Sequence, residues 1–245
     1  MQSILTIAGF DTSGGAGIHA DIKTARKLGF HACSAITAIT SQNTCKISDI
    51  YVVNASVLEN QLRAIAEDIR FSAIKIGMVP DDNTARIILK FLENLNVPKV
   101  LDPVIRASTG FKIGCVEGYR ILMKEIDVLT PNVHEAEEIL GISIKDFESA
   151  KKAAMKISDR FSLVITGFGG RDVVYDADNK EFHIVGRKFG RNEVHGTGCV
   201  YSTALTCYLA DGMDLYSACR KARRFVMGAA KRSLKIGKCL PVVNP

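Results

Sequence analysis

Short apolar runs alternate with segments of helical spacing along most of this chain, and that alternation constrains its fold more than any other feature. Residues 3–8 form an apolar run that ends at Gly9, as a buried strand does, and residues 18–28 have helical spacing up to Gly29. Strands and helices that alternate at such short intervals form right-handed βαβ units. The pattern predicts an α/β fold with a mostly parallel central sheet and helices on both of its faces.

The rest of the chain continues this alternation. Further strands are expected at residues 32–39, 73–77, 99–101, 127–129 and 163–165, and a β-hairpin at 173–176 and 181–185. Further helices are expected at residues 57–69, 84–95, 119–124, 133–140, 147–158, 200–210 and 215–234. No repeat, low-complexity linker or shift in composition interrupts the series, so we expect a single domain over residues 1–245.

The charge of the chain suits small anionic ligands. A formal net charge of +6 is too small to argue for nucleic acid by itself. The basic residues gather late, at residues 220–224 and at Lys231 and Arg232. We interpret them as the solvated face of a terminal helix, with a contact to nucleotide phosphates or nucleic acid as the alternative. No nucleic-acid partner is therefore expected.

Cysteine usage and hydropathy predict a cytoplasmic protein. The chain has seven cysteines, an odd number, and no C-x-x-C pair. This usage predicts neither a disulfide framework nor a structural zinc site, and it favours a reducing setting. Residues 1–9 are apolar but lack the basic lead of a signal peptide. No apolar run approaches the ~18 residues that a membrane span needs, so no membrane association is expected.

Residues 195–199 read His-Gly-Thr-Gly-Cys and stand directly before an apolar helix. Glycines at a helix start leave free backbone N–H groups accessible, and the helix dipole adds partial positive charge, so this turn suits a phosphate. Gly196, Thr197 and Gly198 are expected to hold the anion. The same field is expected to lower the pKa of the Cys199 thiol and make it a base. An ordinary glycine-rich helix start with a buried cysteine is the alternative.

Polar or glycine-rich segments follow strand after strand. The ligands of an open parallel sheet bind beyond the carboxyl ends of its strands, and these segments fall at those ends. They are residues 9–17, 42–43, 77–78, 102–103, 130–132 and 166–170. This recurrence indicates a ligand site at the carboxyl edge of the sheet.

The glycine-rich segment after the first strand contains the dinucleotide pattern G-x-G-x-x-A at residues 15–20. Residues 30–48 contain no Asp or Glu to hold a ribose, and the chain has no P-loop motif. The segment is better explained as a loop that lets a ligand approach the backbone, or as a tight strand–helix turn. Asp21, in the following helix, either stabilises the helix start through the dipole or accepts a hydrogen bond from a ligand amine.

Two carboxylates follow other expected strands. Asp102 precedes a proline, and Glu135 lies one turn into a helix that opens at Asn132. Beside a phosphate site, the two are suited to holding Mg²⁺ through its waters. Glu135 is alternatively a helix-start carboxylate with Asn132 as the N-cap. His195 is either an acid or base of the reaction or a structural residue of its turn.

The ordered motifs together resemble one family. They are Ala8-Gly9, Asp11, residues 13–17, Ala20-Asp21, Thr37-Ala38, residues 42–44, 75–78, 101–104, 130–136 and 195–199. Over nearly the whole chain they resemble hydroxymethylpyrimidine/phosphomethylpyrimidine kinases of the ribokinase-like superfamily. The resemblance implies a three-layer αβα sandwich, a homodimer, and the cofactors ATP and Mg²⁺. It implies 4-amino-5-hydroxymethyl-2-methylpyrimidine and its monophosphate as phosphoryl acceptors in thiamin biosynthesis.

The resemblance also implies roles for single residues. Asp21 and Gln42 would hydrogen-bond the aminopyrimidine, because a carboxylate and an amide pair with its amine and ring nitrogens, and around its ring would lie Gly9, Met78 and Val104. Asp102 and Glu135 would form the metal side, and the nucleotide-phosphate side would include Asn132, Thr166 and Gly167. Gly196 to Cys199 would form the anion hole, with Cys199 where many relatives carry an aspartate base.

Two positions depart from the family pattern. Phe10 stands where the family usually has serine, and Thr166 stands where relatives carry a lysine before the glycines. Either turnover is slow, or the missing charge comes from a nearby base such as Arg171, Arg187, Lys188 or Arg191. A pyridoxine/pyridoxal kinase of the same superfamily and a pyrimidine-binding regulator without turnover are the alternative functions.

Overall fold

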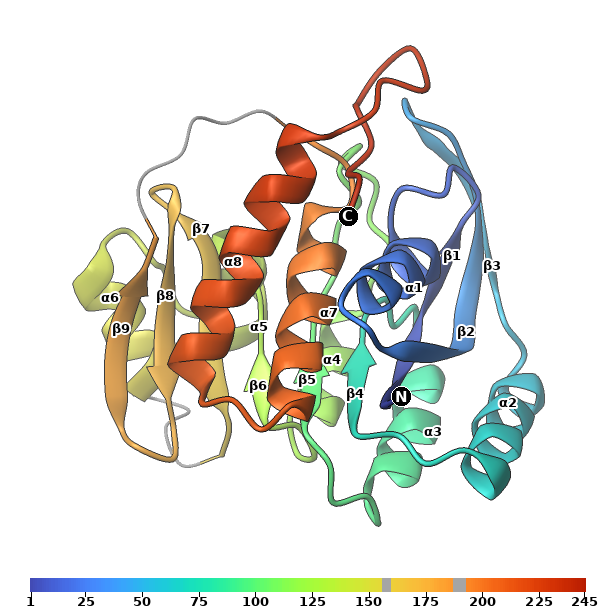
Figure 1. Cartoon of the computed structure of the whole chain (residues 1–245), viewed down its shortest axis with the longest axis horizontal. Helices are drawn as coiled ribbons and strands as arrows, with labels where there is room; N and C mark the ends of the chain where they lie inside the picture. Colours follow the sequence, from blue (N-terminus) through green and yellow to red (C-terminus); the bar gives the residue numbers. More distant parts are fainter. Residues whose placement is uncertain (156–159, 187–192) are drawn as a thin grey trace.

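The computed structural model describes residues 1–155, 160–186 and 193–245 (Figure 1). The strands of this part are β1 (Ser3–Asp11), β2 (His31–Gln42), β3 (Ile47–Val52), β4 (Ala73–Ile76), β5 (Lys99–Leu101), β6 (Val128–Leu129), β7 (Ser162–Phe168), β8 (Arg171–Asp176) and β9 (Glu181–Val185). The helices of this part are α1 (Gly17–Lys27), α2 (Ala55–Asp68), α3 (Asp82–Leu92), α4 (Val116–Leu122), α5 (Val133–Leu140), α6 (Phe147–Met155), α7 (Thr197–Ala210) and α8 (Leu215–Lys231).

The described strands form one sheet in the order β3-β2-β1-β4-β5-β6-β7-β8-β9. The six central strands, β2-β1-β4-β5-β6-β7 in sheet order, are parallel to one another. At one side β3 pairs antiparallel with β2, and at the other β8 pairs antiparallel with β7 and β9 with β8. The predicted α/β class, with a mostly parallel sheet between two helical layers, is confirmed. All carboxyl ends of the parallel strands therefore meet at one edge, where the sequence analysis expects a ligand site.

Alternating apolar side chains along the central strands place one core on each face of the sheet. Val100 and Val128 are paired in register and belong to the core under α7 and α8, while Leu101 and Leu129, the next pair, belong to the core under α2 to α6. Helices α1, α7 and α8 cover the face turned toward the viewer in Figure 1. The sheet is thus the middle layer of three.

Most expected elements are present with bounds shifted by three residues or fewer, and two differences concern the sheet. Strand β3 was not expected, because it is an edge strand with mostly exposed residues and so lacks a buried apolar run. Strand β1 continues beyond Gly9 to Asp11 after a register shift against β2, so part of the expected loop is strand. The expected helix at 147–158 is present over Phe147–Met155, and residues 156–159 lie outside the described part.

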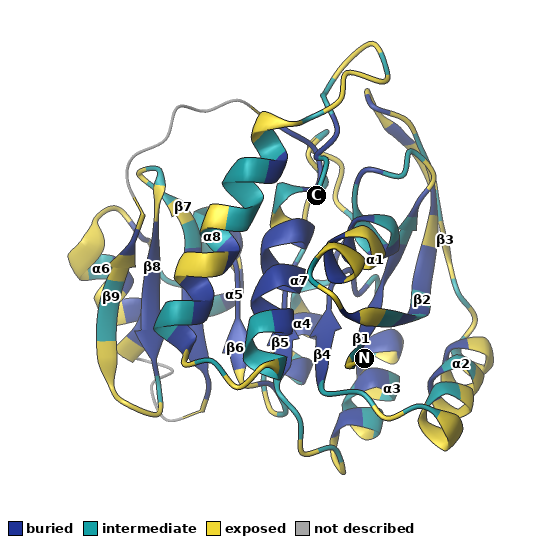
Figure 2. Ribbon diagram, in the orientation of Figure 1, coloured by how far each residue is buried: buried dark blue, intermediate teal, exposed yellow. Residues whose placement is uncertain are grey.

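Helix α7 passes through the middle of the molecule and carries the glycine-rich turn at its start. It is buried from Cys199 to Cys207, as Figure 2 shows by its dark colour. Its N-cap Gly196 has φ +89°, and a Cβ there would collide with the Gly15 carbonyl oxygen. The turn therefore requires glycine at this position, and α7 fixes it against the loop after β1.

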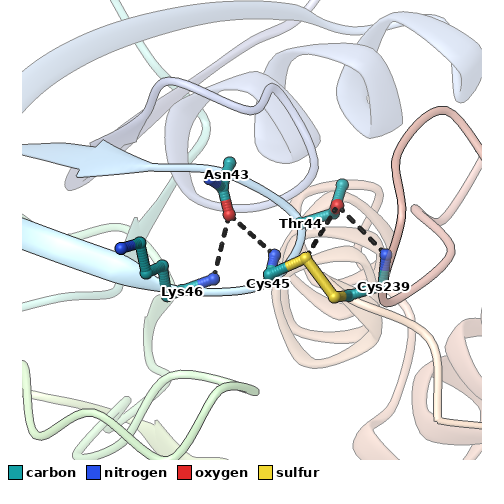
Figure 3. The surroundings of a disulfide bond; sticks show 5 residues. All are labelled: Asn43, Thr44, Cys45, Lys46 and Cys239. Carbon is teal, nitrogen blue, oxygen red and sulfur yellow. Dashed lines mark hydrogen bonds between the residues drawn. A yellow bond between two sulfur atoms is a disulfide. The ribbon is translucent and has the colours of Figure 1, made fainter.

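One disulfide contradicts the expectation drawn from the cysteine pattern. Cys45, in the turn between β2 and β3, is bonded to Cys239 near the chain end (Figure 3). Beside the disulfide, Cys239 N donates a hydrogen bond to Thr44 Oγ1, and Leu240 N donates one to the Thr44 carbonyl. The two cysteines are 194 residues apart, so no local spacing could indicate the pair. The other five cysteines are free thiols.

Reducing this disulfide is expected to lower the free energy of unfolding by about 2–5 kcal/mol, because the bond closes a long loop in the unfolded chain. The measurement is chemical unfolding with and without dithiothreitol, on the wild type and on the double variant Cys45→Ser/Cys239→Ser. The double variant should unfold at the lower denaturant concentration in both conditions. An equal effect of dithiothreitol on the wild type and the double variant would contradict this prediction.

No described helix is long and apolar enough to cross a membrane.

Candidate functional site

A cavity of about 1220 Å³ opens at the carboxyl ends of the parallel strands. It lies where ligands of open α/β sheets bind. Every site residue that the sequence analysis named, except Asp21, contributes to its wall. Those that line it are Gly9, Gln42, Met78, Asp102, Val104, Asn132, Glu135, Thr166, Gly167, Gly196, Thr197, Gly198 and Cys199. Segments far apart in the sequence thus meet in one place, although their individual roles stay predictions.

The start of α7 forms part of the cavity wall, since Gly196, Thr197 and Gly198 all line it. No side chain caps this helix start, so its amides are available to an anion. The field does not lower the pKa of Cys199, however. Burial raises the pKa of this thiol to about 12 despite the charge of Lys75. The expectation of a lowered thiol pKa is therefore wrong, because desolvation outweighs the charge of Lys75 and the hydrogen bond from Gly17.

Asp21 lies beneath the cavity rather than in its wall. Its carboxylate accepts hydrogen bonds from Thr6 Oγ1 at 2.5 Å and Thr203 Oγ1 at 2.7 Å. It also pairs with Lys75 Nζ at 3.1 Å, and both side chains are fully buried. Burial is the largest single influence on the pKa of Lys75 and would lower it, but the surrounding acidic groups, Asp21 first and Asp102 among the others, together outweigh burial and raise that pKa. All described partners of Asp21 are thus protein groups, and its direct contact with a ligand stays a prediction.

Lys75 also connects this buried pair to the cavity wall. Its Nζ lies 3.8 Å from Asp102 Oδ2, which accepts a hydrogen bond from Ser202 Oγ at 2.9 Å. Burial raises the pKa of Asp102, and the positive charge of Lys75 opposes that rise. Lys75 therefore supports the Asp102 carboxylate from below. Sequence reasoning included Lys75 in the motif at residues 75–78 but gave it no role, because the sequence does not show which carboxylates surround it.

Glu135 caps the start of its own helix and also lines the cavity, while its metal role stays a prediction. Its backbone N–H donates to Asn132 Oδ1 at 3.0 Å, and its Oε2 accepts from Asn132 N at 2.9 Å, which is a capping box at the start of α5. The same carboxylate faces the cavity and accepts from Ile105 N at 3.3 Å. Burial, with the charge of Asp102 as a further cause, raises the pKa of Glu135 to about 8.

This pKa makes the stability of the protein depend on pH. Between pH 4.5 and about 8 the folded state keeps a proton on Glu135 that the unfolded state loses, so the free energy of unfolding falls as pH rises through this range. Glu135→Gln keeps a capping side chain but cannot ionise. We expect the variant to match the wild type near pH 4.5 and to exceed its stability by a few kcal/mol at pH 9. Urea unfolding across this range is the measurement, and parallel pH profiles would contradict the prediction.

The two carboxylates have the donor chemistry for Mg²⁺ but form no complete cage. The part of the chain that the structure describes holds no group of three or more His, Cys, Asp or Glu side chains arranged around a metal. Mg²⁺ keeps several waters and is bound by one or two protein carboxylates plus substrate phosphates. Asp102 and Glu135, two buried carboxylates that repel each other in one cavity wall, fit this mode of binding.

At the other end of the cavity, the turn between β7 and β8 is held by an arginine from α8. Arg223 donates to Asp172 Oδ1 at 2.7 Å and to the Gly170 carbonyl, while Asp172 Oδ1 also accepts from Gly167 N at 3.0 Å. Arg223 lines the cavity beside Thr166 and Gly167. Arg223 therefore differs from the solvated basic residues expected at 220–224, because its side chain is bound to Asp172. It adds a cation near the uncharged Thr166.

Of the four bases proposed to replace the missing lysine, the structure describes only Arg171. Arg171 is exposed and absent from the cavity wall. Arg187, Lys188 and Arg191 lie outside the described residues. Phe10, the other departure, lines the cavity and packs on the His19 ring with centroids 4.6 Å apart.

Comparison with known proteins identifies the family. A family model described as phosphomethylpyrimidine kinase matches residues 11–244. The chain belongs to the phosphomethylpyrimidine kinase family. The hydroxymethylpyrimidine/phosphomethylpyrimidine kinase of Aquifex aeolicus is 36% identical, over 98% of this chain and 98% of its own length. The enzyme of the same name from Haemophilus influenzae is 35% identical, over 97% of this chain and 94% of its own length. The resemblance read from the motifs is confirmed, and the chain is a kinase.

Solved structures of this family's fold are similar to the chain over its full length. The pyridoxal kinase from Staphylococcus aureus in complex with ADP superposes with a TM-score of 0.88 at 30% identity, covering 100% of this chain and 93% of its own. The phosphomethylpyrimidine kinase from Clostridium difficile gives a TM-score of 0.80 at 32% identity, covering 94% and 100%. The ribokinase-like fold class is therefore confirmed.

Proposed function

We propose that this kinase transfers the γ-phosphoryl group of ATP to the hydroxymethyl group of 4-amino-5-hydroxymethyl-2-methylpyrimidine, and then to the resulting monophosphate. The observation that carries this proposal is the composition of one cavity. Its wall combines an uncapped helix start, two buried carboxylates and a surface of Gly9, Met78 and Val104 that suits a flat ring. Relatives named for both reactions support the choice of acceptor.

The parts of the cavity divide the work of phosphoryl transfer. The amides of Gly196 to Gly198, at an uncapped helix start in the cavity wall, would stabilise charge that develops on the transferred group. Asn132, Thr166 and Gly167 line the wall near Arg223, where donor phosphates would meet a cation. Gln42 lies on the acceptor side and offers an amide to the aminopyrimidine.

We propose that Mg²⁺ binds between Asp102 and Glu135 through its waters, where it would neutralise the phosphate charge of the nucleotide. A bound cation favours ionised Glu135, so Mg²⁺ should raise the thermal midpoint of the wild type at pH 8. The variant Glu135→Gln should gain less, because it lacks the charge. An equal gain in both proteins would argue against this site.

Pyridoxal is the alternative acceptor. It is favoured by the similarity to the S. aureus pyridoxal kinase, whose structure in complex with pyridoxal superposes with a TM-score of 0.88 at 31% identity. Both acceptors are flat nitrogen heteroaromatics with a hydroxymethyl arm. An ADP-release assay with ATP and Mg²⁺ tests the pyrimidine alcohol, its phosphate and pyridoxal side by side. The largest kcat/KM for pyridoxal would overturn our choice, and tight pyrimidine binding without turnover would identify a regulator.

We further propose that the protein acts in the cytoplasm, which supplies ATP, and as a homodimer. The edge strand β3 and the start of α2 support the second proposal, because Tyr51, Val52 and Val57 expose apolar side chains there. Sedimentation at several concentrations would test the dimer, and Tyr51→Lys should weaken it if this edge is the interface.

A further inference from the structure

The imidazole of His195 lines the cavity and contacts three separate segments. Its Nε2 is 2.8 Å from Asp11 Oδ2 and 3.2 Å from Gln42 Nε2. Its Nδ1 is 3.1 Å from Ser108 Oγ. The residue is buried, and its backbone is fixed by the chain end, since its N–H donates to the Pro241 carbonyl and its carbonyl accepts from Val243 N. The ring is therefore held while three segments converge on it.

Asp11 determines which ring nitrogen carries a proton. Its carboxylate accepts from Ser13 N and Oγ, from Gly15 N and from Ala16 N, at 2.7–3.1 Å. Burial would raise the pKa of Asp11, but hydrogen bonds from His195 and Ser13 outweigh it and lower that pKa to about 2. An ionised carboxylate only accepts, so Nε2 of His195 donates to it. In the neutral ring Nδ1 is then free to accept from the Ser108 hydroxyl.

The same proton orients the amide of Gln42. An Nε2–H group cannot face the NH₂ end of the amide favourably, because both are donors. The favourable orientation turns the amide oxygen toward His195 and the NH₂ group toward Thr40 Oγ1, which lies 3.2 Å from the other end of the amide. Because Gln42 lines the cavity, this orientation decides whether its N–H donor or its oxygen meets a ligand ring.

Ser108 lies at the tip of a segment that covers the acceptor side. We call residues 105–113 the flap; it is folded back on itself by hydrogen bonds from Ala107 N to Phe111 O and from Ile113 N to Ile105 O. Five consecutive residues from Val104 to Ser108 line the cavity. Among the described hydrogen bonds, the one with His195 is the only side-chain bond from the flap tip. The neighbouring Thr109 hydroxyl has no described partner.

We propose that His195 is a positioning residue for the pyrimidine, which couples docking of the flap through Ser108 to the orientation of the Gln42 amide. The proposal rests on the proposed function, because it takes the pyrimidine as the ligand beside Gln42. Gly15 supports it independently: a Cβ at this position would lie 2.6 Å from His195 Cδ2, so the loop after β1 leaves space for the ring. Neither Asp11 nor His195 needs to touch the reacting atoms.

A double-mutant cycle tests the coupling. Ser108→Ala removes the flap contact, and His195→Gln keeps a polar group near Asp11 and Gln42 but cannot reach Ser108. We expect each change to raise the KM of the pyrimidine alcohol about tenfold, with the KM of ATP within about twofold of the wild type. The double variant should be no worse than either single variant, because both remove the same connection. Multiplied losses in the double variant would overturn the proposal.

Two further variants separate positioning from folding. Thr109→Val, beside Ser108 in the flap, is the matched control and should leave the KM of the pyrimidine unchanged; a tenfold rise would contradict the proposal. His195→Asn retains a polar group on the Ser108 side but withdraws from Asp11 and Gln42, so it should weaken pyrimidine binding more than His195→Gln does. Equal affinities of these two variants would also contradict it.

Calorimetric binding of the pyrimidine alcohol without ATP keeps the two hypotheses distinguishable. If the wild type binds no pyrimidine and turns none over, the proposed function fails before the variants are compared. If the wild type binds it and Ser108→Ala binds it equally well, the function stands and the positioning role of His195 is overturned.

Discussion

Replacing Cys199 with alanine is expected to slow phosphorylation of the pyrimidine alcohol about 100-fold, while slowing phosphorylation of its monophosphate less than tenfold. The alcohol must lose a proton as it attacks, and Cys199 lines the cavity beside the anion-binding amides. The acceptor of the second reaction is a phosphate oxygen that is already ionised at neutral pH, so it needs no base. The measurement is kcat/KM for both acceptors with one enzyme preparation.

The burial of Cys199 adds a pH dependence to this prediction. With a pKa of about 12, the thiol is almost entirely protonated at pH 7. If the thiolate is the base, its fraction rises about tenfold for each pH unit below that pKa, and the alcohol reaction should rise with it between pH 7 and 9. The Cys199→Ala variant should lose that slope. A rate on the alcohol that does not vary with pH would assign the thiol a role other than base.

Cys207→Ala provides the matched control for this experiment. Cys207 is a buried thiol in the same helix, and burial raises its pKa to about 12 as well, but it does not line the cavity. Its removal should change neither reaction beyond about twofold. Equal losses of the two reactions in Cys199→Ala would contradict the division of roles, since only the alcohol needs a proton acceptor.

The sequence predicted those features whose cause is local. The apolar pairs at Val100-Leu101 and Val128-Leu129 indicated central strands because both faces of this sheet are covered. Asn132 and Glu135 indicated a helix start because the capping box is encoded within four residues. The carboxyl edge of the sheet then determined where the ordered motifs meet, so the cavity wall could be predicted without knowing any distance.

Features that depend on which way a side chain points, or on distant segments, could not be predicted. Asp21 lies in the expected helix, but only the packing of α1 on α7 shows that it faces Thr203 and Lys75 rather than the cavity. Arg223 stands among solvated basic residues, and nothing in its neighbours distinguishes it. Likewise, the field of a helix start is visible in the sequence, whereas the burial that dominates the pKa of Cys199 is a property of the fold.

Replacing Lys75 with methionine is expected to lower the free energy of unfolding by about 3–5 kcal/mol, the largest effect on stability that we expect of any single substitution. The ammonium group is fully buried with Asp21 at 3.1 Å and with Asp102 at 3.8 Å. Removing it leaves two buried carboxylates without their cation. Urea unfolding measures the loss, and Arg63→Met is the control, because the exposed Arg63–Glu67 pair should contribute less than about 1 kcal/mol.

A second substitution separates the net contribution of this ion pair to the free energy of unfolding from the destabilisation caused by removing only one of its partners. The hydrogen bonds from Thr6 and Thr203 satisfy the Asp21 carboxylate, so the intact pair compensates much of its own desolvation. Adding Asp21→Asn to Lys75→Met removes the uncompensated charge and should recover part of the lost stability. If the double variant is instead less stable than Lys75→Met alone, the carboxylate stabilises the fold without the lysine. The contacts with Thr6 and Thr203, rather than the ion pair, would then hold α1 and α7 together beneath the cavity.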